Sequence, residues 1–251
     1  DALAARPIRP LPRAQPRHAQ TVADLRTHFP NFAEVLEMIV PHLQLQVRLG
    51  IALQLPPLLL LGPPGIGKTH FARRLAQALE AMVQIQDLSG TTAGFLITGN
   101  APNWADSAPG CIARLLARLP DGQHPMVFFD EVDKARTGNF PADQALLKVL
   151  ESESARQFRD EHLDVHLDAQ PISYLLACNR LESIRPELLS RVQVIAVPAP
   201  GPEQMPLIVR SVDAELRAEM PPLERVFRPL SEALIAQMPE LSPRQLRRFL
   251  L

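Results

Sequence analysis

Residues 62–69 carry the pattern with the clearest chemistry in this chain. They read G-P-P-G-I-G-K-T, which matches G-x-x-x-x-G-K-[ST] in full, between a short apolar run and a helical stretch. Such glycines let backbone N–H groups close around phosphates, and the N-terminus of the following helix adds a favourable dipole. Lys68 is expected to reach the β- and γ-phosphates, and the Thr69 hydroxyl to ligate Mg²⁺. The residues expected to bind a nucleoside triphosphate are Gly62, Pro63, Pro64, Gly65, Ile66, Gly67, Lys68, Thr69 and His70.

An acidic pair follows the apolar run Met126–Phe129. A buried strand there would deliver Asp130 to the metal side of the phosphate site. The neighbouring Glu131 could then polarise a water for attack on the γ-phosphate. The alternative is a pair of acidic residues that caps a strand, but its occurrence together with the phosphate loop favours the catalytic interpretation.

Two further polar residues stand at strand boundaries. Asn179 follows the run Ser173–Ala177, where its side chain could hold the attacking water, although an asparagine in an ordinary turn explains it equally well. Arg191 precedes the run Val192–Val197. It could stabilise transition-state charge in a neighbouring subunit, whereas pairing with a surface carboxylate is the commoner role of a single arginine.

These residues need a scaffold, and the hydrophobic pattern predicts one. The runs Leu58–Leu61, Met126–Phe129, Ser173–Ala177 and Val192–Val197 have strand length and are mostly apolar, as in a parallel sheet covered on both faces. Apolar residues at helical spacing between residues 31 and 53 indicate a helix that Pro41 splits or kinks. Residues 71–81 indicate another helix. The fold class is therefore α/β, a P-loop parallel sheet flanked by helices, followed by a small all-α lid domain.

The strand signal stops near residue 200, which sets the predicted domain boundaries. Residues 1–24 hold several prolines and arginines and predict an extended tail or linker. Residues 25–199 form the α/β nucleotide-binding domain, and residues 200–251 form the helical lid. The chain starts at Asp1 rather than methionine, from which we expect a module of a longer parent chain.

Composition narrows the class of partner and compartment. The 26 Lys and Arg residues against 27 Asp and Glu residues argue against a nucleic-acid partner. No apolar run has the length of a membrane span. The two cysteines, Cys111 and Cys178, fit a reducing compartment, so we expect a cytoplasmic protein. His162 with His166, and Asp160 with Glu161, are expected to be solvated surface groups rather than metal or acid–base sites.

The order of these motifs resembles that of the AAA+ ATPases. Within them, residues 130–197 are most similar to the Lon ATP-dependent proteases. The segments that carry this similarity are Asp130–Lys134, Ala145–Leu150, Phe158–Asp160, Leu163–Val165, Ile184 and Leu188–Val192. The resemblance implies Mg²⁺-dependent ATP hydrolysis, with Asn179 as the sensor-1 residue and Arg191 as an arginine finger that acts across a subunit interface. It also implies that Arg244 is the sensor-2 arginine of the lid.

The same resemblance implies a substrate and an assembly. It places Trp104 on a loop that faces a central pore, where an aromatic ring grips unfolded or tagged polypeptide, and it makes residues 134–141 a second pore loop. The oligomer would be a homo-hexameric ring. The sequence departs from the family pattern at two places. Alanine and aspartate follow Trp104, where the family has an aliphatic residue and glycine. Near the adenine, the family has an aromatic, glycine-containing motif, where this chain has Thr27–Phe32.

Two rival functions remain at this point. The first is a nucleic-acid-handling AAA+ motor of the clamp-loader or branch-migration type, which would need a basic surface. The second is a regulatory or assembly ATPase that does not translocate a substrate. No Ser-Lys protease domain follows the lid, so we expect no protease activity in this chain, although a protease or other effector domain could be joined in the parent chain.

Overall fold

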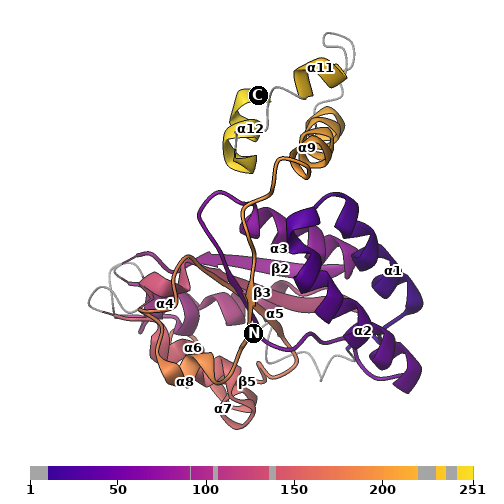
Figure 1. The fold of residues 1–251 in the computed structure, drawn as a ribbon. Helices are drawn as coiled ribbons and strands as arrows, with labels where there is room; N and C mark the ends of the chain where they lie inside the picture. The colour runs from indigo at the N-terminus through magenta and orange to yellow at the C-terminus, as the bar shows by residue number, and fades with distance from the viewer. Residues whose placement is uncertain are drawn as a thin grey trace.

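The structure is a computed structural model that describes residues 11–90, 92–103, 107–135, 140–219, 230–235 and 242–250. Within these residues the chain forms a parallel five-stranded sheet in the order β2-β3-β6-β1-β7 (Figure 1). The strands are β1 (Leu58–Leu61), β2 (Ala81–Asp87), β3 (His124–Asp130), β6 (Ser173–Cys178) and β7 (Gln193–Ala196). The predicted α/β fold is confirmed.

Alternate residues of the central strands enter two separate cores, which explains why these strands are mostly apolar. In β1, Leu58 and Leu60 belong to one core and Leu59 to the other. In β3, Phe128 and Phe129 divide in the same way. Because successive side chains of a strand point to opposite faces, a sheet covered on both faces needs apolar residues at every position.

Helices cover the two faces unequally. One face carries α1 (Pro16–Asp24), α2 (Ala33–Leu49) and α3 (Lys68–Ala78). The other carries α4 (Ala93–Thr98), α5 (Cys111–Arg118), α6 (Asp143–Leu150), α7 (Ser152–Arg156) and α8 (Pro186–Leu189). Short 3₁₀ turns are η1 (Leu25–Thr27), η2 (Pro30–Phe32) and η3 (Val132–Lys134). In Figure 1 the first group lies on the right of the sheet and most of the second group on the left.

The prediction of an extended tail over residues 1–24 is wrong from residue 16 onward. Residues 16–24 form α1, and Pro16 occupies its first turn, where a missing N–H removes no intrahelical bond. The segment before it is also tied down, since Leu53 N donates to Pro12 O at 2.9 Å. Val22 is fully buried in the core that α1 shares with α2 and α3. Residues 1–10 lie outside the described residues.

Pro41 does not split the helix in which it stands. The helix α2 runs from Ala33 to Leu49 with Pro41 inside it. A proline in a helix interior loses one backbone hydrogen bond and costs about 3 kcal/mol. Val35, Ile39 and Leu43 are buried on the face toward the sheet, and their burial offsets that cost.

The strand β2 was not predicted, and the helix before it is shorter than expected. The helix α3 ends at Ala78, whereas the sequence indicated a helix to residue 81. Residues 81–87 alternate polar and apolar side chains only loosely, and all of them are at least partly exposed. The strand lies at the edge of the sheet and pairs only with β3 over its whole length. An edge strand needs less apolar surface, so its signal in the sequence is weak.

Asp160 is not a solvated surface group as expected. It ends β4 (Phe158–Asp160), which pairs with β5 (Val165–Leu167) in a two-stranded antiparallel sheet. Its side chain is fully buried, and its oxygens accept hydrogen bonds from the backbone N–H groups of Gly110, His162 and Leu163 at 2.8, 3.0 and 2.9 Å. A buried carboxylate needs such donors, so Asp160 has a structural role here.

The described residues that follow β7 are helical or irregular and contain no strand. The helices are α9 (Met205–Glu219), α11 (Glu232–Ile235) and α12 (Pro243–Leu250). They enclose a separate core that includes Met205, Val209, Leu216 and Leu246. Figure 1 shows this helical group beyond the end of α3. The division into two domains near residue 200 stays a prediction.

No helix among the described residues combines the length and the apolar character that crossing a bilayer requires.

Acid is expected to destabilise this fold through His124, the first residue of β3. Its ring is fully buried, and Nε2 lies 2.6 Å from Ser173 Oγ. Burial, together with the nearby His18, lowers the pKa of His124 from 6.5 to about 3. Below pH 6.5 the His124 imidazole therefore binds a proton in the unfolded chain but stays neutral in the folded chain. Stability is complete above pH 6.5 and is lost progressively toward pH 3, by about 2 kcal/mol between pH 7 and pH 5.

Urea unfolding at pH 7 and pH 5 checks this expectation. His124→Gln removes the titrating group. Between pH 7 and pH 5, its free energy of unfolding should therefore fall by about 2 kcal/mol less than that of the wild type. The exposed His166, replaced in the same way, is the matched control. An unchanged pH dependence in His124→Gln would assign the acid sensitivity to other groups.

Candidate nucleotide-binding site

Three neighbouring strands end at one edge of the sheet and present the polar residues singled out above. The strand β1 leads into residues 62–67, β3 ends at Asp130, and β6 is followed by Asn179. Because β3, β6 and β1 are adjacent and parallel, their carboxyl ends lie together. Binding sites of open α/β sheets occupy this edge.

Glycines in the phosphate loop meet specific steric demands. A Cβ on Gly62 would lie 2.3 Å from the backbone O of Val197, just after β7, so no larger residue fits there. Gly65 and Gly67 have φ of +84° and +101°, a left-handed conformation that glycine adopts without strain. The loop therefore curls tightly before α3 begins at Lys68.

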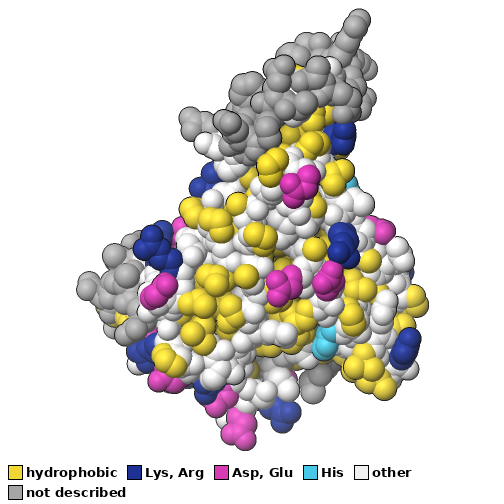
Figure 2. Space-filling model, viewed as in Figure 1, with side chains coloured by type: hydrophobic (Ala, Val, Ile, Leu, Met, Phe, Trp, Pro, Cys, Tyr) yellow, Lys and Arg dark blue, Asp and Glu magenta, His cyan; other side chains and the backbone are white. Residues whose placement is uncertain are grey.

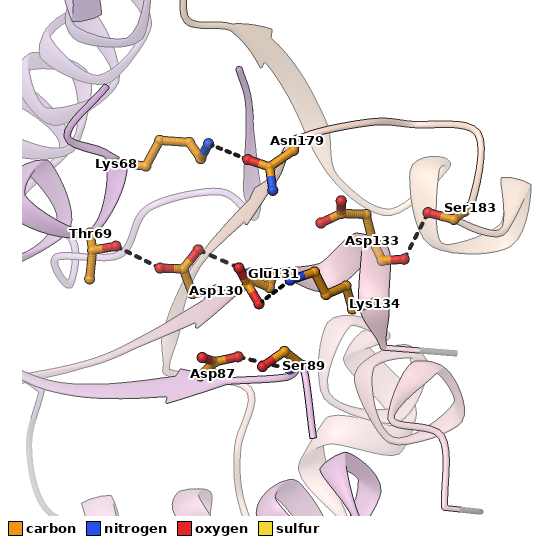
Figure 3. Close-up of polar contacts among 10 residues, drawn as sticks. All are labelled: Lys68, Thr69, Asp87, Ser89, Asp130, Glu131, Asp133, Lys134, Asn179 and Ser183. Atoms are coloured by element: carbon orange, nitrogen blue, oxygen red, sulfur yellow. Dashed lines mark hydrogen bonds and ion pairs between the residues drawn. The ribbon is translucent and has the colours of Figure 1, made fainter. Parts of the chain in front are cut away.

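Lys68 links the phosphate loop to the end of β6. Its Nζ donates to the backbone O of Gly62 at 2.6 Å and to the backbone O of Pro63 at 3.0 Å. It also donates to Asn179 Oδ1 at 3.0 Å (Figure 3). Burial lowers the pKa of Lys68, and the Asp130 carboxylate opposes that shift. A buried ammonium held only by neutral oxygens strongly favours an anionic ligand.

Thr69 and Asp130 meet at the start of α3. Thr69 Oγ1 donates to Asp130 Oδ2 at 2.6 Å, and Glu131 N donates to Asp130 Oδ1 at 3.0 Å. Protein sites for Mg²⁺ use one or two carboxylates with hydroxyl, water and phosphate oxygens. The Thr69 and Asp130 oxygens fit that donor set. Among the described residues, no three His, Cys, Asp or Glu side chains gather into an alternative metal site.

Glu131 has an unusual backbone and an exposed partner. Its φ is +57°, a left-handed conformation that costs a non-glycine residue free energy and that recurs at functional sites. Glu131 Oε2 lies 2.8 Å from Lys134 Nζ, and the two side chains are 31% and 48% exposed. Such an exposed ion pair contributes about 1 kcal/mol or less. The Glu131 carboxylate can therefore exchange Lys134 for a water at little cost.

A cavity of about 840 Å³ joins these residues to the helical region. This volume lies within the usual range for small-molecule sites. Its walls come from the phosphate loop, α3, the ends of β3 and β6, and from α9 and α12. They include Gly65, Gly67, Lys68, Thr69, His70, Asp130, Glu131, Asn179, Glu215 and Arg244. The structure thus brings most of the predicted site residues around one space.

Arg244 of α12 lies next to the phosphate loop. Its backbone N donates to Gly65 O at 3.3 Å, and its side chain lines the cavity. His70 lines the same cavity one residue after Thr69. None of residues 27–32 lines it, although Phe29 packs beside His70 with ring centroids 5.2 Å apart.

Arg191 lies elsewhere. It donates to Glu187 O at 2.8 Å and to Glu151 Oε1 at 3.4 Å. It also lines a separate cavity of about 370 Å³ beside residues 54–57, which precede β1. That cavity is at the amino ends of the strands, so the structure does not bring Arg191 to the phosphate loop of its own chain. Trp104 lies outside the described residues, as do residues 136–139 of the second predicted pore loop.

Some cavity residues carry no signal in the sequence. Arg73, Arg74 and Gln77 follow the phosphate loop on α3, and Glu215 and Glu219 stand on α9. In sequence they are ordinary polar positions of helices. Only the placement of α9 beside α3 makes them part of the site. A carboxylate without a motif, such as Glu215, could not have been identified beforehand.

The segment that contains this fold and site also matches a known protein family. Residues 58–198 match the model of the ATPase family associated with various cellular activities (AAA). This match covers more than half of the chain and spans the phosphate loop, β3 and β6. The chain belongs to the AAA family.

Relatives of this AAA chain include Lon proteases. It is 30% identical over 196 residues to the Lon protease of Nitrosococcus oceani, which covers 77% of this chain and 25% of that protein. It is 33% identical over 136 residues to the mitochondrial Lon protease homolog of Saccharomyces cerevisiae, covering 53% of this chain and 12% of that protein. The chain therefore spans a quarter or less of these relatives.

Solved structures confirm the AAA fold. A closed-state reconstruction of Hsp104 with ATPγS and FITC casein has a TM-score of 0.70 at 15% identity and covers 93% of this chain and 46% of that one. The extended conformation of the S. cerevisiae Hsp104–casein complex has a TM-score of 0.71 at 16% identity, covering 92% and 45%. At such identities the likeness concerns the fold.

Proposed function

We propose that this AAA chain hydrolyses ATP with Mg²⁺ in a homo-oligomeric ring of six subunits and uses the turnover to unfold or translocate polypeptide. The observation that carries the nucleotide part is the linked set Lys68–Asn179 and Thr69–Asp130 at one end of the 840 Å³ cavity. It combines a buried cation, oxygen ligands and a phosphate loop in one place.

Each site residue then has a stated role. The phosphate loop and Lys68 bind the β- and γ-phosphates. Thr69 and Asp130 would hold Mg²⁺, which when bound offsets charge on the phosphate oxygens. Glu131 takes a proton from the water whose oxygen attacks the γ-phosphorus, and ADP leaves with the bridging oxygen. Asn179 positions that water, and Arg244 senses the nucleotide from the lid.

The position of Arg191 supports assembly into a ring. Held by Glu187 and Glu151 at the amino ends of the strands, it is remote from the phosphates that its own chain would bind. An arginine that stabilises transition-state charge from there must act on a nucleotide in another copy. The hexameric number rests on the resemblance to the Lon family.

A polypeptide substrate is supported by similarity and by charge. The Hsp104 structures with this fold hold casein, and the curated relatives are Lon proteases. On the face that Figure 2 shows, basic and acidic side chains are interspersed rather than gathered into a basic stripe. A surface that tracks nucleic-acid phosphates would need such a stripe.

The test is an ATPase assay with Mg²⁺, with and without casein or double-stranded DNA, on the wild type and on Trp104→Ala. We expect casein to stimulate the wild type. Trp104→Ala should keep the basal ATPase rate and lose the stimulation by casein, because the aromatic side chain that grips polypeptide is absent. Equal stimulation of both proteins would remove Trp104 from substrate handling. Stimulation by DNA alone would favour a nucleic-acid motor, and turnover that no polymer changes would favour a regulatory ATPase.

A further inference from the structure

Glu215 of α9 reaches across the cavity to the helix that follows the phosphate loop. Its Oε1 forms a hydrogen bond with His70 Nε2 at 3.2 Å, and its Oε2 lies 2.9 Å from the same nitrogen. Oε1 also lies 3.6 Å from Arg74 Nε. The Glu215 side chain is only 13% exposed. A carboxylate only accepts hydrogen bonds, so His70 Nε2 carries the proton in this contact. This carboxylate therefore joins the lid to the helix that begins at Lys68.

A second contact stands one turn earlier on α9. Ser211 Oγ lies 2.8 Å from His28 Nδ1. Residues 211 and 215 are four apart, so they share one face of the helix. That face is turned toward the α/β part of the chain, because His28 follows η1 and His70 belongs to α3. The contacts Glu215–His70 and Ser211–His28 thus help to set the orientation of α9 over the cavity.

We propose that Glu215 is a positioning residue that holds the lid over the nucleotide through His70, an inference that rests on the proposed ATPase function. His70 follows Thr69 directly, so a shift of the phosphate loop moves His70 with it. Phe29 packs against the His70 ring at 5.2 Å and limits how the ring can turn. Movement at the phosphates is thereby transferred to α9 rather than absorbed by a side-chain rotation.

The lid contributes to binding only while α9 and α12 stay in place. Val212, Arg244 and Pro243 line the cavity from these helices. If Glu215 no longer holds α9, the lid spends less time closed. The apparent nucleotide affinity then falls in proportion to the fraction of molecules whose lid is closed. Contacts within the phosphate loop stay intact, so the loss should appear mainly in affinity.

The test measures ATPγS binding by isothermal titration calorimetry for Glu215→Gln, His70→Gln and the double variant. We expect each single change to weaken binding by about 5- to 20-fold. The double variant should bind no more weakly than the weaker-binding single variant, because both changes remove the same Glu215–His70 contact. KM for ATP should rise by a larger factor than kcat falls. The matched control is Asp213→Asn, since Asp213 is a carboxylate of α9 that pairs with Arg217 at 2.9 Å.

Several results would overturn the inference. Wild-type affinity in Glu215→Gln would show that the contact does not position the lid. Losses that add fully in the double variant would show that Glu215 does not act through His70. Thermal unfolding without nucleotide reports whether each variant folds. If Glu215→Gln does not fold, the binding affinity of His70→Gln is the test. Failure of the wild type itself to bind ATPγS would instead refute the proposed function.

Discussion

Glu131→Gln is expected to leave ATP bound while turnover falls about 100- to 10,000-fold, the usual contribution of a general base. Glutamine has nearly the size of glutamate, so the phosphate loop, Lys68 and Asp130 keep their geometry. Its amide cannot take a proton from the attacking water. Losing the ion pair with Lys134 costs little, because that pair is exposed.

Single-turnover phosphate release and equilibrium ATP binding should be measured on the same preparation. Binding within about twofold of wild type together with the lost turnover would assign Glu131 to the chemical step. The matched control is Glu37→Gln, because Glu37 is a carboxylate of α2 that forms an exposed ion pair with Arg26. Hydrolysis by Glu131→Gln at the wild-type rate would remove this residue from the mechanism.

Lys68→Met is expected to weaken nucleotide binding about 100-fold without destabilising the chain. The Lys68 ammonium is the cation at the centre of the phosphate site, and charge-assisted hydrogen bonds to phosphate oxygens contribute about 3 kcal/mol, or roughly 100-fold in affinity. In the nucleotide-free chain, burial disfavours the charged form, which is why the pKa of Lys68 is lowered. Methionine fills a similar volume and removes that desolvation cost.

Thermal unfolding with and without Mg²⁺-ATP separates these effects. The wild type should gain stability from the nucleotide, whereas Lys68→Met should gain much less. Without nucleotide, Lys68→Met should match the wild type in stability or exceed it. Lys148→Met, on the exposed side of α6, is the control for loss of a lysine. An ATP-dependent rise in Tm for Lys68→Met equal to that of the wild type would contradict the assigned role.

Much of the candidate site could be predicted because its residues stand next to strand ends. Strands β1, β3 and β6 are short and mostly apolar, so the sequence marks where each one stops. Once the sheet is parallel, Lys68, Asp130 and Asn179 must meet at one edge. The contacts Lys68–Asn179 and Thr69–Asp130 follow from that arrangement, although 111 and 61 residues separate the partners.

Predictions failed where tertiary packing outweighs a local preference. Proline density indicated a tail, yet Pro16 begins α1, which buries Val22 against the core. Of the two outcomes expected at Pro41, a split helix is excluded, because the buried face of α2 outweighs one lost hydrogen bond. The strand β2 escaped notice since an edge strand carries little apolar surface.

The amino-acid sequence by itself determined the α/β class, the phosphate loop and the acidic strand end, because each depends on neighbouring residues and on a periodicity of a few positions. Tertiary structure alone decided which lid residues close the cavity. Glu215 meets His70 across 145 positions of the chain, and Arg191 lies beside a cavity away from the phosphate loop of its own chain. Such contacts depend on how whole helices pack, and packing combines many weak interactions between residues far apart in the chain.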